Sequence, residues 1–146
     1  SILADPRNRN IVEVLNKMIK MRDFWMPFAP TILDSAAKKY LINSEKTPAP
    51  FMMVAFDTTD LGKRDLAGAV HPYDKSVRPQ ILKRSDNPSY YDIIKKFEKL
   101  TKVGAILNTS FNIHGEPIVC TPADALGVFA RTDLKYLQLN NFLISK

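Results

Sequence analysis

The most constraining feature of the sequence is an apolar segment that opens into a cluster of hydrogen-bonding side chains. Residues 104–107 have the composition and length of a buried strand. Asn108, Thr109, Ser110 and Asn112 then precede a Gly-Glu-Pro turn. Amides and hydroxyls beside a buried strand cost free energy unless they find partners. A fold that buries this strand must therefore supply those partners, either from the turn itself or from a ligand.

Two interpretations of this cluster are open. Ser110 and Asn112 are two residues apart, so in an extended segment their side chains point the same way. One hydroxyl and one amide would then face a common target, as in ligand sites at the ends of strands. The same residue types also cap turns and helix starts through local hydrogen bonds. The motif alone favours neither interpretation.

The rest of the sequence alternates between helical and strand-like segments. Helix starts are predicted at Asn10, with Glu13 at capping-box spacing, at Asn87 before Pro88, and at Thr121 before a proline. A polar loop is predicted at 43–50, and 58–66 is ambiguous. The pattern predicts helices from Asn10 to before Pro27 and at 35–41, 87–100 and 121–130, and strands at 28–33, 51–56, 78–83, 104–107, 136–139 and 142–145. We therefore expect an α/β fold, a twisted mixed sheet with covering helices, in a single domain over 1–146.

Composition limits the partners and the compartment. The chain has 146 residues, 45% of them hydrophobic, and a net charge of +6, which suits anionic partners or simple solubility. Cys120 is the single cysteine, so the chain cannot form an intrachain disulfide, and we expect a cytoplasmic protein. The apolar run before Cys120 predicts a position in the core. No segment approaches the ~20 apolar residues that span a membrane, so no membrane partner is expected. The beginning Ser1-Ile2-Leu3-Ala4, without Met, suggests a piece of a longer protein.

The sequence contains no motif for a phosphate-binding loop or a metal site, but it does contain a set of cations that could bind an anion. The five glycines lack phosphate-loop spacing, and no Cys/His constellation predicts a metal site. Lys20 and Arg22 are two residues apart where the first helix should give way to extended chain, and Arg78 begins a predicted strand. Together with a Ser/Asn pair, three cations suit a phosphate ester. The alternative is that they are ordinary surface charges near a helix end.

Five ordered blocks of sequence resemble the C-terminal domain of the ATP-dependent O-carbamoyltransferases of nodulation-factor and antibiotic biosynthesis. The resemblance covers essentially the whole chain, and the Asn-Thr-Ser-Phe-Asn…Gly-Glu-Pro block is its most specific part. The blocks are Asp5-Pro6-Arg7, Lys20-Met21-Arg22-Asp23, Met26-Pro27-Phe28-Ala29-Pro30, Arg78-Pro79-Gln80 and Asn108 to Asn112 with Gly115 to Val119.

The resemblance implies a fold like that of the threonylcarbamoyl-adenylate synthases, and a reaction. In that family the C-terminal domain converts carbamoyl phosphate and ATP, with Mg²⁺, into carbamoyl adenylate, and phosphate and pyrophosphate leave. An N-terminal acceptor-binding domain of the same polypeptide then transfers the carbamoyl group to an acceptor hydroxyl. The partners implied are therefore carbamoyl phosphate, ATP and that N-terminal domain.

The resemblance also assigns roles to residues. The adenylate-forming synthases carry Lys-x-Arg and Ser-x-Asn signatures, which here fall on Lys20 and Arg22 and on Ser110 and Asn112. Arg78 matches the arginine of the family's Arg-Pro-Gln block. The catalytic set implied is Lys20, Arg22, Arg78 and Ser110, and the substrate-binding set is Arg7, Asn108, Ser110 and Asn112.

Two departures from the family concern anion contacts. Met26 stands where many relatives have an arginine, so one anion contact is either missing or replaced by Arg84 or Lys75. The family's Gly-Pro-Arg-Ala-Leu motif is expected immediately before Ser1.

Two functions of other classes compete with the adenylate-forming one. The first is a module that binds double-stranded RNA or tRNA, since the fold that the resemblance implies also suits these ligands and a lysine cluster lies at 95–102. The aromatic residues fall mostly in predicted core positions, which argues against nucleic acid as a partner. The second is a catalytically silent domain that supports its N-terminal partner.

Overall fold

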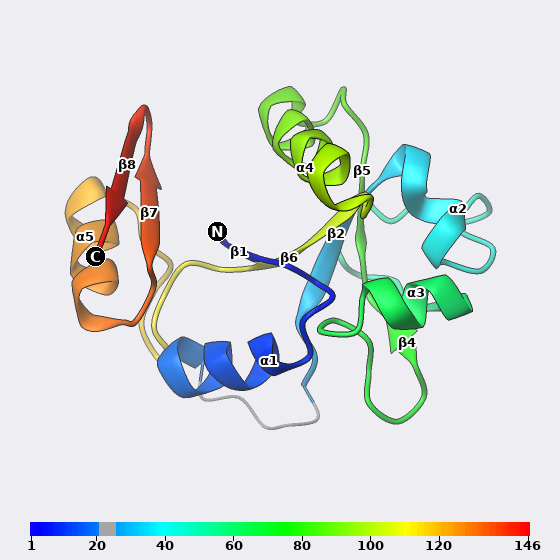
Figure 1. Cartoon of the computed structure of the whole chain (residues 1–146), viewed down its shortest axis with the longest axis horizontal. Helices are drawn as coiled ribbons and strands as arrows, with labels where there is room; N and C mark the ends of the chain where they lie inside the picture. The colour runs from blue at the N-terminus through cyan, green and yellow to red at the C-terminus, as the bar shows by residue number, and fades with distance from the viewer. Residues whose placement is uncertain (21–25) are drawn as a thin grey trace.

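The structure is an α/β arrangement of a mixed sheet and surrounding helices (Figure 1). The computed structural model describes residues 1–20 and 26–146, with the backbone alone for Met18 and Lys20. No helix among these residues is long and apolar enough to cross a membrane. The strands are β1 (Ile2–Ala4), β2 (Ala29–Leu33), β3 (Phe56–Asp57), β4 (Ser76–Val77), β5 (Gln80–Leu82), β6 (Ala105–Thr109), β7 (Tyr136–Leu139) and β8 (Phe142–Ser145).

The helices alternate with these strands, as the sequence pattern predicts. Two short irregular helices join them: a π-helix, η1, and a 3-10 helix, η2. The helical elements are α1 (Asn10–Leu15), η1 (Asn16–Lys20), η2 (Asp34–Ala36), α2 (Ala37–Tyr40), α3 (Asp60–Asp65), α4 (Pro88–Thr101) and α5 (Pro122–Arg131).

The largest sheet has four strands in the order β1-β6-β2-β5. β6 runs antiparallel to both β1 and β2, whereas β2 and β5 are parallel, with Thr31 opposite Gln80. The sheet is therefore mixed, which confirms that part of the prediction. β3 pairs with β4, and β7 pairs with β8 in a separate two-stranded hairpin (Figure 1).

The two faces of the sheet bury two hydrophobic clusters. Successive strand residues point to opposite faces, and in β6 Ile106 joins one cluster while Leu107 joins the other. The first cluster packs the sheet against the elements α2, α3 and α4 through residues such as Tyr40, Leu66 and Ile94. The second packs it against α1, α5 and the β7–β8 hairpin. The central strands are thus buried on both sides.

Local capping signals are confirmed at two of the three predicted helix starts. The Asn87 side chain accepts a hydrogen bond from the Tyr90 backbone at 3.1 Å, with Pro88 as the first helical residue. Thr121 and Asp124 form a reciprocal capping box at 3.2 and 2.9 Å. Both signals involve residues only three apart, so the sequence alone is sufficient to specify them.

The predicted capping box at Asn10 is wrong. Asn10 is already helical, its neighbour Arg9 makes no capping hydrogen bond through its side chain, and the Asn8 side chain accepts from the Asn10 backbone at 3.0 Å. Asn8 therefore takes the role that the spacing predicts for Asn10.

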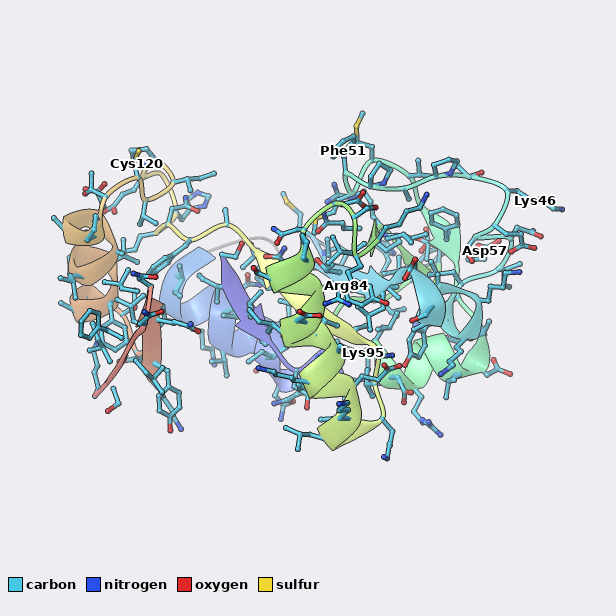
Figure 2. The ribbon with its side chains drawn as sticks, turned by 90° about the horizontal axis from the view of Figure 1, so that it is seen from above. Lys46, Phe51, Asp57, Arg84, Lys95 and Cys120 are labelled. Atoms are coloured by element: carbon cyan, nitrogen blue, oxygen red, sulfur yellow. The ribbon has the colours of Figure 1, made fainter. Side chains whose placement is uncertain are left out.

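The predicted strand at 51–56 is also wrong, because only Phe56 and Asp57 are extended as β3. Met52 has a φ of 56°, a left-handed conformation that interrupts an extended chain. Phe51 and Met53 are 77% and 80% exposed, and Figure 2 shows Phe51 at an outer loop. The ambiguous segment that follows is helical, as α3, with Thr59 as its capping residue.

Two further predictions need adjustment. The strand predicted at 78–83 begins only at Gln80, after Pro79, because proline has no N–H to donate to a strand ladder. Cys120, predicted in the core, is instead exposed at the surface of the loop before α5 (Figure 2).

Candidate functional site

One end of the four-stranded sheet collects three of the predicted site residues. β2 begins at Ala29, which lies opposite Asn108 of β6, and Ser110 follows directly after β6. Because β2 and β5 are parallel with Thr31 opposite Gln80, Arg78 is level with Ala29. The register therefore brings Arg78, Asn108 and Ser110 to the same end of the sheet.

A buried polar network lies just inside this end. The Thr31 side chain is fully buried, and its hydroxyl donates to Gln80 Oε1 at 3.1 Å and accepts from the Tyr90 hydroxyl at 3.1 Å. The Asn108 amide nitrogen lies 3.4 Å from the same hydroxyl. Burial raises the pKa of Tyr90, so this phenol stays neutral and can donate. The network ties three strands to α4 behind the candidate site.

Sequence reasoning missed Thr31 and Tyr90 as partners of the Arg-Pro-Gln block. The available signal was a threonine inside the apolar run 29–33, whose hydroxyl needs a partner when it is buried. Which partner it meets depends on strand register and cannot be read from local sequence. The sequence predicts Asn108 in a turn or at a ligand. Its amide approaches Thr31 of the neighbouring strand, and a role toward a ligand stays a prediction.

Ser110 and Asn112 interact with each other. The Ser110 hydroxyl donates to Asn112 Oδ1 at 2.7 Å, and the Asn112 amide donates to the carbonyls of Ile113 and Glu116 at 3.0 and 2.8 Å. Both side chains are half-buried. These contacts support the interpretation in which the pair holds a turn, and a role toward a ligand stays a prediction.

The Gly-Glu-Pro turn is held to α5 by an ion pair. Arg131 donates to both carboxylate oxygens of Glu116, at 2.6 and 2.9 Å. These hydrogen bonds hold the pKa of Glu116 below its usual value. Gly115 has a φ of 80°, a conformation that favours glycine, and the Val119 backbone donates to Phe111 at 3.0 Å to close the loop. The loop 110–119 thus has a defined shape.

This loop is also tied to the segment that carries Lys20. The backbone N–H of His114 donates to the carbonyl of Ile19 at 2.8 Å, and Ile19 directly precedes Lys20 in η1. Short π-helical turns are rare and occur frequently at functional sites. Lys20 lies in this helical turn, so the expected extended segment does not begin there. Arg22 and the rest of 21–25 lie outside the described residues.

The remaining predicted cations have protein partners in the structure. Arg78 is exposed, and its Nη1 donates to the Met52 carbonyl at 2.8 Å. Arg7 forms a bidentate ion pair with Asp5, with 2.6 Å between Nη2 and Oδ2. That pairing lowers the pKa of Asp5 and raises the pKa of Arg7.

Arg7 belongs to a second basic region. It lines a hollow of about 660 Å³ whose other cations are Lys39, Arg64 and Lys102.

The two residues predicted to replace the missing arginine at Met26 also have protein partners. Arg84 pairs with Asp92 at 3.3 Å, and the Lys75 ammonium donates to the Pro72 carbonyl.

The residues at the sheet end suit anionic ligands. Arg78 presents an exposed guanidinium, which matches the oxygen pairs of a phosphate. Hydroxyl and amide groups of Ser110 and Asn112 lie on the loop joined to η1. Guanidinium, hydroxyl and amide groups of this kind can bind the oxygens of a phosphate. The described residues contain no group of three or more His, Cys, Asp or Glu arranged to hold a metal ion.

The class of protein comes from sequence comparison. The chain matches the family described as carbamoyltransferase C-terminus over residues 1–146. It belongs to that family, as the ordered motifs predict.

The relatives are longer than this chain. It is 42% identical over 146 residues to an uncharacterized protein of Methanocaldococcus jannaschii, covering all of this chain and 28% of the relative. It is 39% identical to nodulation protein NolNO of Sinorhizobium fredii and 37% identical to nodulation protein NolO of Bradyrhizobium diazoefficiens. Each match covers the whole chain, but only 22% and 27% of those two relatives. The chain thus spans about a quarter of the length of the curated relatives it matches.

Proposed function

We propose that this chain is the carbamoyl-adenylate-forming part of a carbamoyltransferase. The observation that carries the proposal is the hydrogen bond from His114 to Ile19, because it joins the Ser-x-Asn loop to the helical turn that ends at Lys20. The strand register adds Arg78 at the same end of the sheet. Family membership supplies the transferase class.

The proposed reaction consumes one water molecule. Carbamoyl phosphate is cleaved by water to carbamate and phosphate, and a carbamate oxygen then attacks the α-phosphorus of ATP. The bond between the α-phosphorus and the bridging oxygen breaks, and pyrophosphate leaves with that oxygen. Negative charge builds on the leaving oxygens in both steps, so fixed cations stabilise the transition states more than the ground states.

The candidate residues of the sheet end and of the segment 20–22 have distinct roles in this scheme. Lys20 and Arg22 bind the phosphate oxygens, and the exposed Arg78 guanidinium supplies a third positive charge. Ser110 and Asn112 orient the carbamoyl group or the α-phosphate, and Asn108 adds an amide beside them. Arg7 lies toward the opposite end of the sheet, in the second basic region, and takes no part in this scheme. ATP would bind as its magnesium complex, in which the ion would neutralise further phosphate charge, since Mg²⁺ usually binds through substrate phosphates. The acceptor hydroxyl binds to the N-terminal domain.

The test is carbamoyl phosphate-dependent exchange of labelled pyrophosphate into ATP by the full-length protein that contains this chain. Exchange is expected, and it requires Mg²⁺. Absence of exchange in a protein that still carbamoylates an acceptor would exclude adenylate formation. By calorimetry the chain 1–146 alone should bind ATP weakly, and more tightly with Mg²⁺. It should carbamoylate no hydroxyl, because the acceptor site is proposed to lie outside it.

A further inference from the structure

A groove lies between two strand edges. Its cavity of about 550 Å³ is lined by Ser1, Ile2 and Leu3 along β1 and by Tyr136 to Leu139 along β7. Side chains alternate between the two faces of a strand, so a groove that meets consecutive residues runs along the edge of each strand. In Figure 1, β7 is the hairpin strand nearer to β1, with β8 beyond it.

Both edges end their sheets. The four-stranded sheet stops at β1, and the hairpin contains only β7 and β8. An edge strand presents N–H and C=O groups that can pair with another strand, and proteins usually protect such edges with charges, proline or bulges. β1 reads Ile-Leu-Ala and β7 reads Tyr-Leu-Gln-Leu, without charge or proline. These two edges therefore carry no charge or proline that would oppose strand pairing.

The lining of the groove is uncharged, although a quarter of all residues in the chain are Asp, Glu, Lys or Arg. Its floor includes the buried Phe111 and Ala125. At its rim Tyr136 and Leu143 are 66% and 71% exposed. A phosphate or a nucleic acid would find no countercharge here, whereas an apolar strand would find pairing edges and an apolar floor.

We propose that this groove receives an extended, apolar segment from the remainder of the carbamoyltransferase polypeptide. That segment adds a strand between β1 and β7 and joins the sheet and the hairpin into one sheet. We choose this occupant because roughly three quarters of each nodulation-protein relative lies outside the matched part and could supply such a segment. The inference concerns assembly and does not depend on the adenylate chemistry.

Cys120 is a built-in reporter for this proposal. It lines the groove, is exposed, and is the single cysteine of the chain. Its labelling by a maleimide, followed by peptide mass mapping, should be at least tenfold slower in the full-length protein than in the chain 1–146. Hydrogen exchange at β1 and β7 should slow in parallel. Equal labelling and exchange rates in the two proteins would overturn the proposal.

A matched pair of variants distinguishes the groove from general surface hydrophobicity. Leu143→Asp places a charge at the rim, and Leu100→Asp places one on α4, where Leu100 is 85% exposed. In the full-length protein, Leu143→Asp should restore rapid labelling of Cys120, whereas Leu100→Asp should leave it slow. Circular dichroism of both variants confirms folding.

The competing occupant is a second copy of this chain. Sedimentation of the chain 1–146 across a range of concentrations tests for it. Self-association that protects Cys120 to the same extent as the full-length protein would assign the groove to a homodimer and overturn the proposal. A monomer with a reactive Cys120 is the expected result.

Discussion

The carbonyl of Ile19 accepts a 2.8 Å hydrogen bond from the backbone N–H of His114, and this contact joins two segments that are far apart in sequence. One segment ends at Lys20, and the other contains Ser110 and Asn112. A backbone hydrogen bond does not depend on which side chain occupies either position. The two signature segments are therefore adjacent for a structural reason that single substitutions at Lys20 or Ser110 leave intact.

The first prediction concerns the cations. In the full-length protein, Lys20→Ala, Arg22→Ala and Arg78→Ala should each reduce ATP–pyrophosphate exchange by roughly 10- to 150-fold, because a lost charge-assisted hydrogen bond costs about 1.5–3 kcal/mol. Arg22→Lys should also reduce exchange if Arg22 makes a bidentate contact with a phosphate. Exchange rates and melting temperatures are measured together.

Lys99→Ala is the matched control, since Lys99 is exposed on α4. It should leave exchange unchanged. If the three site variants also exchange at the parent rate, the cations are ordinary surface charges. If they unfold, their role is structural. Arg78→Ala also removes the hydrogen bond to the Met52 carbonyl. The melting temperature of this variant shows whether a slower exchange comes from lost stability or from lost catalysis.

The second prediction compares the two side chains of the Ser-x-Asn signature. Ser110→Ala removes the hydroxyl that donates to Asn112 Oδ1, whereas Asn112→Ala also leaves the carbonyls of Ile113 and Glu116 without this donor. We expect Asn112→Ala to lower the melting temperature more than Ser110→Ala does. Ser110→Ala should reduce exchange less than the cation variants, because it removes a neutral group. Equal melting temperatures for the two variants would contradict the observed turn geometry.

Local signals predict the helix starts well and the long-range contacts poorly. The caps at Asn87 and Thr121 involve partners three residues away, so composition and spacing are sufficient. The segment around Phe51 misleads the prediction because its apolar run resembles a buried strand, although Met52 turns the chain and leaves its neighbours exposed. Apolar composition alone does not determine burial when a turn intervenes.

In the candidate site, too, the local motifs can be predicted from sequence and the long-range contacts cannot. Its ordered motifs are visible in the sequence and lead to the family, which the comparison confirms. The partners behind the site are not visible there, because Thr31 meets Gln80 and Tyr90 only through one particular strand register. The pairing of Arg7 with Asp5 is within reach of local sequence, since the two residues are only two apart.

The third prediction uses two glycines. A Cβ at Gly62 would clash with the Tyr40 backbone carbonyl, which already accepts from the Thr59 backbone at 2.9 Å and cannot easily move. Gly62→Ala should therefore destabilise the fold by about 1–3 kcal/mol. Gly127 lies within α5, where an added Cβ would meet no atom within 4 Å, so Gly127→Ala should stabilise by about 0.5–1 kcal/mol. Urea titration measures both, and a shift of the same sign in the two variants would contradict this packing.

The fourth prediction concerns acid stability at the start of α5. The Asp124 carboxylate accepts from the backbone N–H groups of Thr121 and Cys120 at 2.9 and 3.2 Å, and these bonds lower the pKa of Asp124. A carboxyl with a lowered folded-state pKa contributes stability above its unfolded pKa of about 3.9. That contribution is lost as the pH falls through the lower folded value.

Asp124→Asn removes this titration while keeping a side chain that can accept hydrogen bonds. Other carboxylates with lowered pKa values, including Glu116, also weaken the parent fold in acid, so the parent and the variant are compared between pH 7 and pH 3. The loss of melting temperature over that interval should be smaller for Asp124→Asn. Thr121→Ala should instead cost about 0.5–2 kcal/mol at both pH values, because its hydroxyl does not titrate. Parallel curves for the parent and Asp124→Asn would show that the capping carboxylate contributes nothing to acid sensitivity.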